Sequence, residues 1–277
     1  MIALGLAIMI VSQAATFAGV EPFASWNTPI AWTGFILFAD GWVYRVRRSS
    51  WIRSAPREFG CLAIVSIPLW IVFEGYNLVI ENWYYVGLPQ NFWLRQFGYA
   101  WSFATIWPAM FEAAELVGLM RGRRSPTAPP LPRHVGILDW VAIATGVAML
   151  TLPLFVPVGV ARYLAAPVFL GFVFLLEPIN QVTGSESLSR DRLINLAFAG
   201  LLCGVLWEFW NFWARAKWIY TVPIMQQLKI FEMPVPGYLG FPAFAVECFT
   251  MYVFVRAALA ALPSTARLVS PGRAIAL

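Results

Sequence analysis

The chain has 277 residues, of which 60% are hydrophobic and only 12% are charged. Soluble domains have roughly 45–50% apolar and about 25% charged residues, so this composition leaves too little polar surface to face water. It excludes an ordinary soluble fold and predicts an all-α integral membrane protein, whose lipid-facing exterior is apolar.

The net charge of +5 does not indicate a nucleic-acid partner, because the basic residues lie in short segments between apolar runs. The single histidine, His134, excludes multi-histidine metal centres and Ser-His or Cys-His catalysis within the membrane. Cys61, Cys203 and Cys248 lie inside apolar runs without CxxC spacing, which favours a packing role over a disulfide or zinc site. We therefore expect no metal and no cofactor.

Eight apolar runs reach or nearly reach the roughly 20 residues that a membrane-spanning helix needs. In chain order they cover residues 2–20, 27–46, 59–80, 97–119, 137–157, 163–183, 193–214 and 238–261. Continuous runs without period-two alternation favour helices over a barrel. The first run lacks a basic region before it, so we expect a retained helix there rather than a signal peptide.

The basic residues predict how the helices cross the membrane. If the N-terminus is cytoplasmic, five basic residues lie outside: Arg95, Arg162, Arg215, Lys217 and Lys229. The other 14 lie in the cytoplasm: Arg45, Arg47, Arg48, Arg53, Arg57, Arg121, Arg123, Arg124, Arg133, Arg190, Arg192, Arg256, Arg267 and Arg273. This bias predicts an inner-membrane protein with both termini in the cytoplasm.

The two halves of the sequence share a pattern at one offset of 134 residues. The matched pairs are Glu74 and Glu208, Asn77 and Asn211, Pro89 and Pro223, Leu94 and Leu228, Phe97 and Phe231, Pro108 and Pro242, and Ala109 and Ala243. We predict two tandem four-helix repeats, residues 1–133 and 134–277. An even number of helices per repeat makes both copies run the same way, about a pseudo-two-fold axis along the membrane normal.

Acidic residues within the apolar runs are functional candidates, because a charge at mid-bilayer costs at least about 2.5 kcal/mol. We predict that Glu74, Glu208 and Glu247 are catalytic, in a neutral form, since basic residues are nearly absent from the same runs. Asp40, Glu112, Glu115 and Glu177 are secondary candidates.

Each Glu-x-x-Asn pair places its two side chains on one helix face, so we expect Asn77 and Asn211 to orient the acids or bind substrate. Six aromatic residues flank these acids on the same helices and could line a cavity: Trp70, Phe73, Tyr76, Trp207, Trp210 and Trp213. Of these, Phe73, Tyr76, Trp207 and Trp210 are the further candidates for substrate binding. Interhelical hydrogen bonding by the acids and lipid-facing aromatics are the alternative interpretations. The later aromatic stretches, 83–85 and 218–220, are typical of a belt at the outer interface.

Within each repeat an acid ends one helix, an aromatic-Glu-x-x-Asn element follows, and a proline precedes a glutamate four or five residues later. This pattern resembles the repeated three-helix unit of the transmembrane lycopene cyclases of bacteria and fungi, over residues 27–119 and 163–261. The resemblance implies a membrane enzyme acting on an isoprenoid. In this sequence more residues separate proline from glutamate than in that family, and a further helix precedes each unit.

Three functions remain open from the sequence. The first is an enzyme of isoprenoid or lipid metabolism, in which a neutral carboxyl protonates a carbon-carbon double bond and aromatic faces stabilise the cation. The second is a small-solute or proton-coupled transporter. The third is a non-catalytic membrane scaffold. In each, the expected partners are membrane lipids, together with a hydrophobic small molecule in the first.

Overall fold

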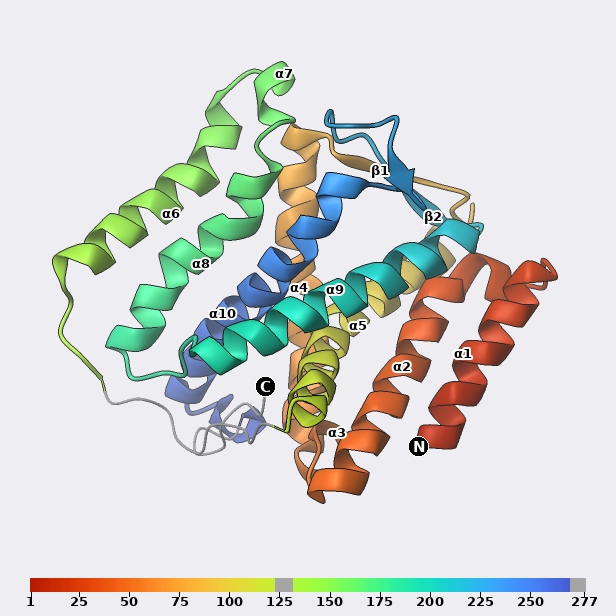
Figure 1. Cartoon of the computed structure of the whole chain (residues 1–277), viewed down its shortest axis with the longest axis horizontal. Helices are drawn as coiled ribbons and strands as arrows, with labels where there is room; N and C mark the ends of the chain where they lie inside the picture. The colour runs from red at the N-terminus through yellow and green to blue at the C-terminus, as the bar shows by residue number, and fades with distance from the viewer. Residues whose placement is uncertain (123–131, 270–277) are drawn as a thin grey trace.

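The computed structural model, described for residues 1–122 and 132–269, is a bundle of long helices with short strands at one end (Figure 1). Its long helices are α1 (Ile2–Phe17), α2 (Phe23–Arg47), α4 (Pro56–Ile80), α5 (Phe92–Met120), α6 (Ile137–Phe155), α8 (Ala165–Val182), α9 (Arg190–Trp213) and α10 (Gly240–Ala261). Its short helices are α3 (Trp51–Ser54), α7 (Val158–Ala161), η1 (Val235–Leu239) and η2 (Ala266–Leu268). The predicted helical class is confirmed; Arg123, Arg124 and Arg273 lie outside the described residues.

Among the residues that the structure describes, six helical segments are long and apolar enough to cross a membrane: Pro56–Ile80, Phe92–Met120, Ile137–Phe155, Ala165–Val182, Arg190–Trp213 and Val235–Ala261. Helix α1 is apolar but has 16 residues, fewer than the roughly 20 that span a bilayer upright. Helix α2 contains Pro29, a non-helical residue at Trp26, and Arg45 and Arg47 in its last turn. A multi-pass membrane protein is thus supported by six segments, and eight spans stay a prediction.

Local sequence signals explain several helix starts. The side chains of Asn91 and Ser189 accept hydrogen bonds from Leu94 N and Arg192 N at the starts of α5 and α9. At the start of α6, the Asp139 carboxylate accepts from Gly136 N at 2.7 Å. With these caps, two helices begin before the apolar runs that predict them. Helix α5 begins at Phe92 rather than at residue 97, and α9 begins at Arg190 rather than at residue 193.

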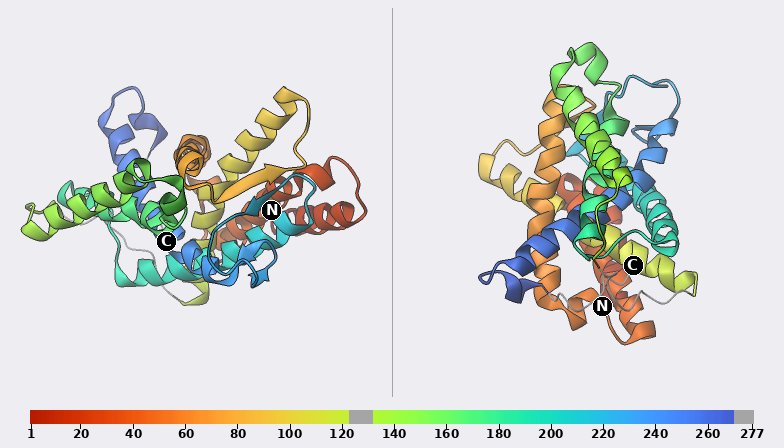
Figure 2. Two further views of the ribbon diagram at one scale, coloured as in Figure 1. Left: turned by 90° about the horizontal axis from the view of Figure 1, so that it is seen from above. Right: turned by 90° about the vertical axis from the view of Figure 1, so that its left-hand side faces the viewer.

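The long helices form two flanks on either side of a central group. Helices α1 and α2 make one flank, α6 and α8 the other, and α4, α5, α9 and α10 lie between them (Figures 1 and 2). Each flank is a closely packed helix pair that meets at glycines: a Cβ on Gly5 would collide with the α2 backbone at Gly34, and a Cβ on Gly146 with the α8 backbone at Gly171. Close approach at small residues is typical of helix pairs in membranes.

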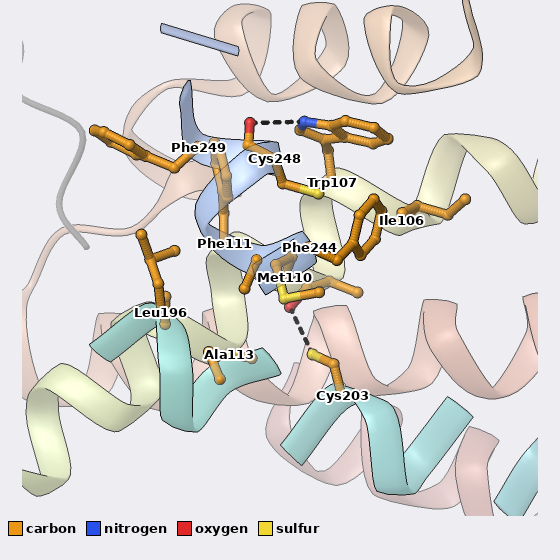
Figure 3. Close-up of a cluster of buried hydrophobic side chains, with 14 of the residues drawn as sticks. Ile106, Trp107, Met110, Phe111, Ala113, Leu196, Cys203, Phe244, Cys248 and Phe249 are labelled. Atoms are coloured by element: carbon orange, nitrogen blue, oxygen red, sulfur yellow. Dashed lines mark hydrogen bonds between the residues drawn. The ribbon is translucent and has the colours of Figure 1, made fainter. Parts of the chain in front are cut away.

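The centre of the bundle is an apolar cluster where α5, α9 and α10 meet (Figure 3). Trp107 of α5 is fully buried there, and its indole nitrogen donates to the carbonyl of Cys248 on α10 at 2.9 Å. Cys61, Cys203 and Cys248 are all buried and free, which agrees with their predicted packing role.

The two aromatic stretches form a short sheet rather than separate interfacial loops. Strand β1 (Trp83–Val86) pairs antiparallel with β2 (Lys217–Tyr220), with Trp83 opposite Tyr220 and Tyr85 opposite Trp218. A second pair joins β3 (Lys229–Ile230) and β4 (Met233–Pro234). The β1–β2 sheet therefore links the two halves of the chain at one end of the bundle (Figure 1).

A buried ion-pair network lies at the opposite end. Arg256 near the end of α10 donates to Glu58 Oε1 in the first turn of α4 at 2.7 Å and to Glu186 Oε1 at 2.9 Å. Glu186, in the α8–α9 loop, also accepts from Arg192 of α9 at 2.7 Å. The network therefore connects α4, α9 and α10 through fully formed charge pairs.

Candidate functional site

A cavity of about 420 Å³ lies beside the β1–β2 sheet, within the range of roughly 300–1,000 Å³ typical of small-molecule sites. Its wall is mainly apolar, is rich in aromatic side chains and comes from both halves of the chain. The first half contributes Trp26, Trp32, Trp70, Trp83, Tyr85, Tyr99 and Phe103; the second contributes Phe169, Trp207, Trp218, Tyr220, Phe241 and Phe244. Such a wall suits an apolar ligand.

Glu74 of α4 lies behind this wall and accepts hydrogen bonds from three of its aromatic side chains. Glu74 Oε1 accepts from the Trp70 indole at 2.8 Å, from the Trp83 indole at 3.3 Å and from the Tyr85 hydroxyl at 2.5 Å. The carboxyl does not itself line the cavity. It fixes the rings that do, and Tyr85 provides a hydrogen-bonded link between the carboxyl and the cavity.

Glu208 of α9 occupies the equivalent place in the second half. The Tyr220 hydroxyl, in the cavity wall, donates to Glu208 Oε1 at 2.9 Å. Glu208 is fully buried, and its Oε2 has no hydrogen-bond partner in the described part of the chain. The two catalytic candidates Glu74 and Glu208 are thus both joined to one cavity through a tyrosine.

Burial, reinforced by the adjacent glutamate, raises the pKa of Tyr85 and of Tyr220 well above the usual value for tyrosine. Both hydroxyls therefore keep their protons at neutral pH and can act as donors.

Asn77 and Asn211 hold the sheet rather than a ligand. Asn77 Nδ2 donates to Trp83 O at 2.8 Å and its Oδ1 accepts from Trp83 N at 3.2 Å. Asn211 makes the same two bonds with Trp218, at 2.9 and 3.0 Å. Neither asparagine lines the cavity. Their effect on the acids is indirect, because they place the strands that carry Tyr85 and Tyr220.

The four aromatic candidates on α4 and α9 lie in different places, and only Trp207 lines the cavity. Phe73 lies behind the wall and stacks on Phe169, with ring centroids 5.2 Å apart. Trp210 packs edge-on against Trp32 at 4.8 Å. The Tyr76 hydroxyl donates to Leu150 O at 3.0 Å, which joins α4 to α6.

Glu247 of α10 lies one helical turn beyond Phe244, which lines the cavity. It is fully buried; its Oε1 accepts from Phe172 N at 3.4 Å, and its Oε2 has no hydrogen-bond partner among the described residues. Phe244 and Phe169 line the cavity, whereas Glu247 does not. Glu247 does not converge with Glu74 and Glu208 on one surface.

Two secondary candidates, Asp40 and Glu177, cap the connections that follow their helices. Asp40 Oδ1 accepts from Ile52 N at 2.8 Å, and Glu177 Oε1 accepts from Leu188 N at 2.7 Å. Their matching contacts indicate a shared structural role.

The other two secondary candidates, Glu112 and Glu115 of α5, are buried toward the same end of the bundle as Asp40. Both oxygens of Glu112 are without a hydrogen-bond partner in the described residues, and its carboxyl lies within electrostatic range of Asp40 and Glu115. Glu115 pairs with Arg47 at 3.5 Å. None of the four secondary candidates lines the cavity.

The residues of the candidate site that the sequence did not predict as site residues are Tyr85, Tyr220 and Phe244. The two tyrosines carried a signal: each stands two residues after a tryptophan that follows an Asn-containing helix. Within residues 1–122 and 132–269, no group of three or more His, Cys, Asp or Glu residues could hold a metal ion.

No protein-family model, curated protein or solved structure matches this chain. The resemblance to transmembrane lycopene cyclases stays a prediction from short motifs, and function has to be inferred from the site itself.

Proposed function

We propose that this chain is a polytopic inner-membrane enzyme that acts on a long apolar molecule, an isoprenoid or another lipid, held in the aromatic cavity. The observation that carries the proposal is a Glu–Tyr pair from each half at one apolar cavity, Glu74–Tyr85 at 2.5 Å and Glu208–Tyr220 at 2.9 Å. An acid behind an aromatic wall suits proton transfer to a carbon-carbon double bond.

The proposed chemistry is an acid-initiated cyclisation or isomerisation. In the reacting state the hydroxyl of Tyr85 or Tyr220 turns from its glutamate to the double bond and gives its proton to one carbon. At the same time the tyrosine oxygen takes a proton from the neutral carboxyl of Glu74 or Glu208, which leaves a carboxylate, a neutral tyrosine and a carbocation. The faces of Trp70 and Trp207 stabilise the cation. Loss of a proton from a neighbouring carbon back to the carboxylate forms the new double bond and restores the acid, so no co-reactant is consumed.

The proposal includes two tandem repeats, eight spans and cytoplasmic termini. Equivalent contacts in the two halves support the repeat: the Asn77–Trp83 and Asn211–Trp218 bonds, and the Asp40–Ile52 and Glu177–Leu188 bonds. The β1–β2 register is also symmetric, because it places each tryptophan opposite the tyrosine of the other copy. This is the pattern that a pseudo-two-fold axis through the sheet would produce.

The test is the isoprenoid profile of a bacterial host that makes acyclic polyenes, with and without this protein. We expect a new cyclic or isomerised product with the native chain. Glu74→Gln with Glu208→Gln should lower it by about 100-fold or more, as expected for loss of a general acid. The matched control is Glu81→Gln, an exposed acid near the same strand. Identical profiles with and without the native protein would refute the enzymatic proposal.

A transporter is the alternative, and the buried Glu112 and Glu247 favour it: in the described part of the chain, both oxygens of Glu112 and Oε2 of Glu247 have no hydrogen-bond partner. Such acids occur on proton paths. A pH-dependent flux in proteoliposomes, lost in Glu112→Gln, would support transport over catalysis.

A further inference from the structure

The cavity wall is apolar over most of its extent, but two arginines also line it. Arg162 follows α7 and Arg95 lies in the first turn of α5; both are half-buried. Neither is explained by the proposed chemistry, which needs acids and aromatic faces.

Arg162 is incompletely bonded by the protein. Its Nη2 donates to the backbone carbonyl of Thr221 at 3.3 Å, and its Nε is buried without a hydrogen-bond partner in the described chain. No acidic residue among those described pairs with it. The protein therefore provides neither a counter-charge nor acceptors for most of the donor groups of this guanidinium. Burying such a group in apolar surroundings costs free energy.

Two other basic residues at this end of the bundle have acidic partners. Lys217 also lines the cavity but pairs with Glu232 at 2.6 Å, and Arg215 pairs with Glu21 at 2.5 Å. Arg95 resembles Arg162, because no ion pair to it is found in the described part of the chain; its guanidinium carbon lies 6.0 Å from the centroid of the Phe92 ring. Of the three basic residues that line the cavity, the two arginines are therefore the ones left for a ligand.

We propose that the ligand of this cavity is an amphipathic anion: an apolar chain lies among the aromatic side chains and a phosphate or carboxylate headgroup binds Arg162. A guanidinium matches the planar, bidentate geometry of these anions. Arg162 lies at the end of the bundle where the sequence predicts the outer membrane interface, which is where amphiphile headgroups reside. The inference rests on the proposed function for the cavity and narrows its substrate class.

The experiment measures binding through tryptophan fluorescence, since Trp26, Trp32, Trp70, Trp83, Trp207 and Trp218 line the cavity. The full chain in a neutral detergent is titrated with geranylgeranyl phosphate, the matching C20 carboxylic acid, the neutral alcohol geranylgeraniol, and phosphatidic acid. We expect the C20 anions to bind at least about tenfold tighter than the alcohol, the usual effect of a charged hydrogen bond. Tighter binding of phosphatidic acid would identify a bilayer lipid as the source of the headgroup.

Arg162→Gln should remove this preference and leave alcohol binding unchanged, which also shows that the variant is folded. Arg162→Lys should keep part of the preference, and Arg57→Gln, exposed at the other end of the bundle, should keep all of it. Equal binding of alcohol and anions by the native chain overturns the inference, as does an equal loss of both in Arg162→Gln. These binding results do not test the proposed enzymatic activity, which is tested by the product profile of the host. If the chain binds the anions but the host forms no new product, the enzymatic proposal is refuted and the anion site stands.

Discussion

Replacing Arg256 by methionine is expected to lower the free energy of unfolding by about 3–5 kcal/mol, because it leaves the buried Glu58 carboxylate without its partner and removes one of the two arginines that pair with Glu186. The Arg256 side chain is 9% exposed, and its partners Glu58 and Glu186 are 2% and 5% exposed. Unfolding in mixed micelles, followed by circular dichroism, measures the change.

Arg121→Met is the matched control, since Arg121 likewise lies at the C-terminal end of a long helix, directly after α5, and pairs with an acid, Asp191, at the start of α9. Its side chain is 23% exposed and that of its partner Asp191 is 52% exposed, with N and O 3.2 Å apart. Exposed pairs contribute about 0–1 kcal/mol, so this variant should change stability little. Equal losses in the two variants would show that burial does not set the strength of these pairs.

Glu74→Leu should be the second strongly destabilising change, by about 3 kcal/mol or more. It leaves the Trp70 indole, the Trp83 indole and the Tyr85 hydroxyl without their acceptor, and an unsatisfied buried donor costs about 1–3 kcal/mol. The same unfolding assay applies, with the fluorescence of the cavity tryptophans as a local readout.

Glu74→Gln separates this structural role from acid chemistry. Glutamine keeps a carbonyl oxygen at the position of Oε1, so most of the stability should return while the product of the proposed reaction stays low. If Glu74→Leu and Glu74→Gln were equally unstable, the loss of product in the glutamine variant would reflect misfolding and could not support catalysis.

The sequence predicted the helices well because their determinants are local. Runs of apolar residues decide where a chain can cross a bilayer, and the described structure has a long helix at each predicted range. The boundaries differ where capping residues act, as at Asn91 before α5. The stretch 83–85 was predicted as part of an interfacial belt; its pairing with 218–220 depends on a partner more than 130 residues away, which periodicity does not reveal.

The site was predicted in part. The Glu-x-x-Asn repeat identified Glu74 and Glu208, because uncommon polar residues at a fixed offset stand out in apolar sequence. It did not reveal that their contacts to the cavity pass through Tyr85 and Tyr220, which lie on the strands. It also grouped Glu247 with them, although that side chain does not line the cavity and accepts from Phe172 N on α8.

The most direct measurement is photo-crosslinking of the protein in lipid nanodiscs with a diazirine-bearing isoprenoid, followed by mass spectrometry of the labelled peptides. If the ligand binds in the cavity, we expect labels on Trp207, Phe244 and strands β1 and β2. Excess unlabelled isoprenoid should reduce this labelling. Labels confined to exposed apolar side chains such as Ile137, Leu138 and Phe155, with no competition, would contradict a ligand site inside the bundle.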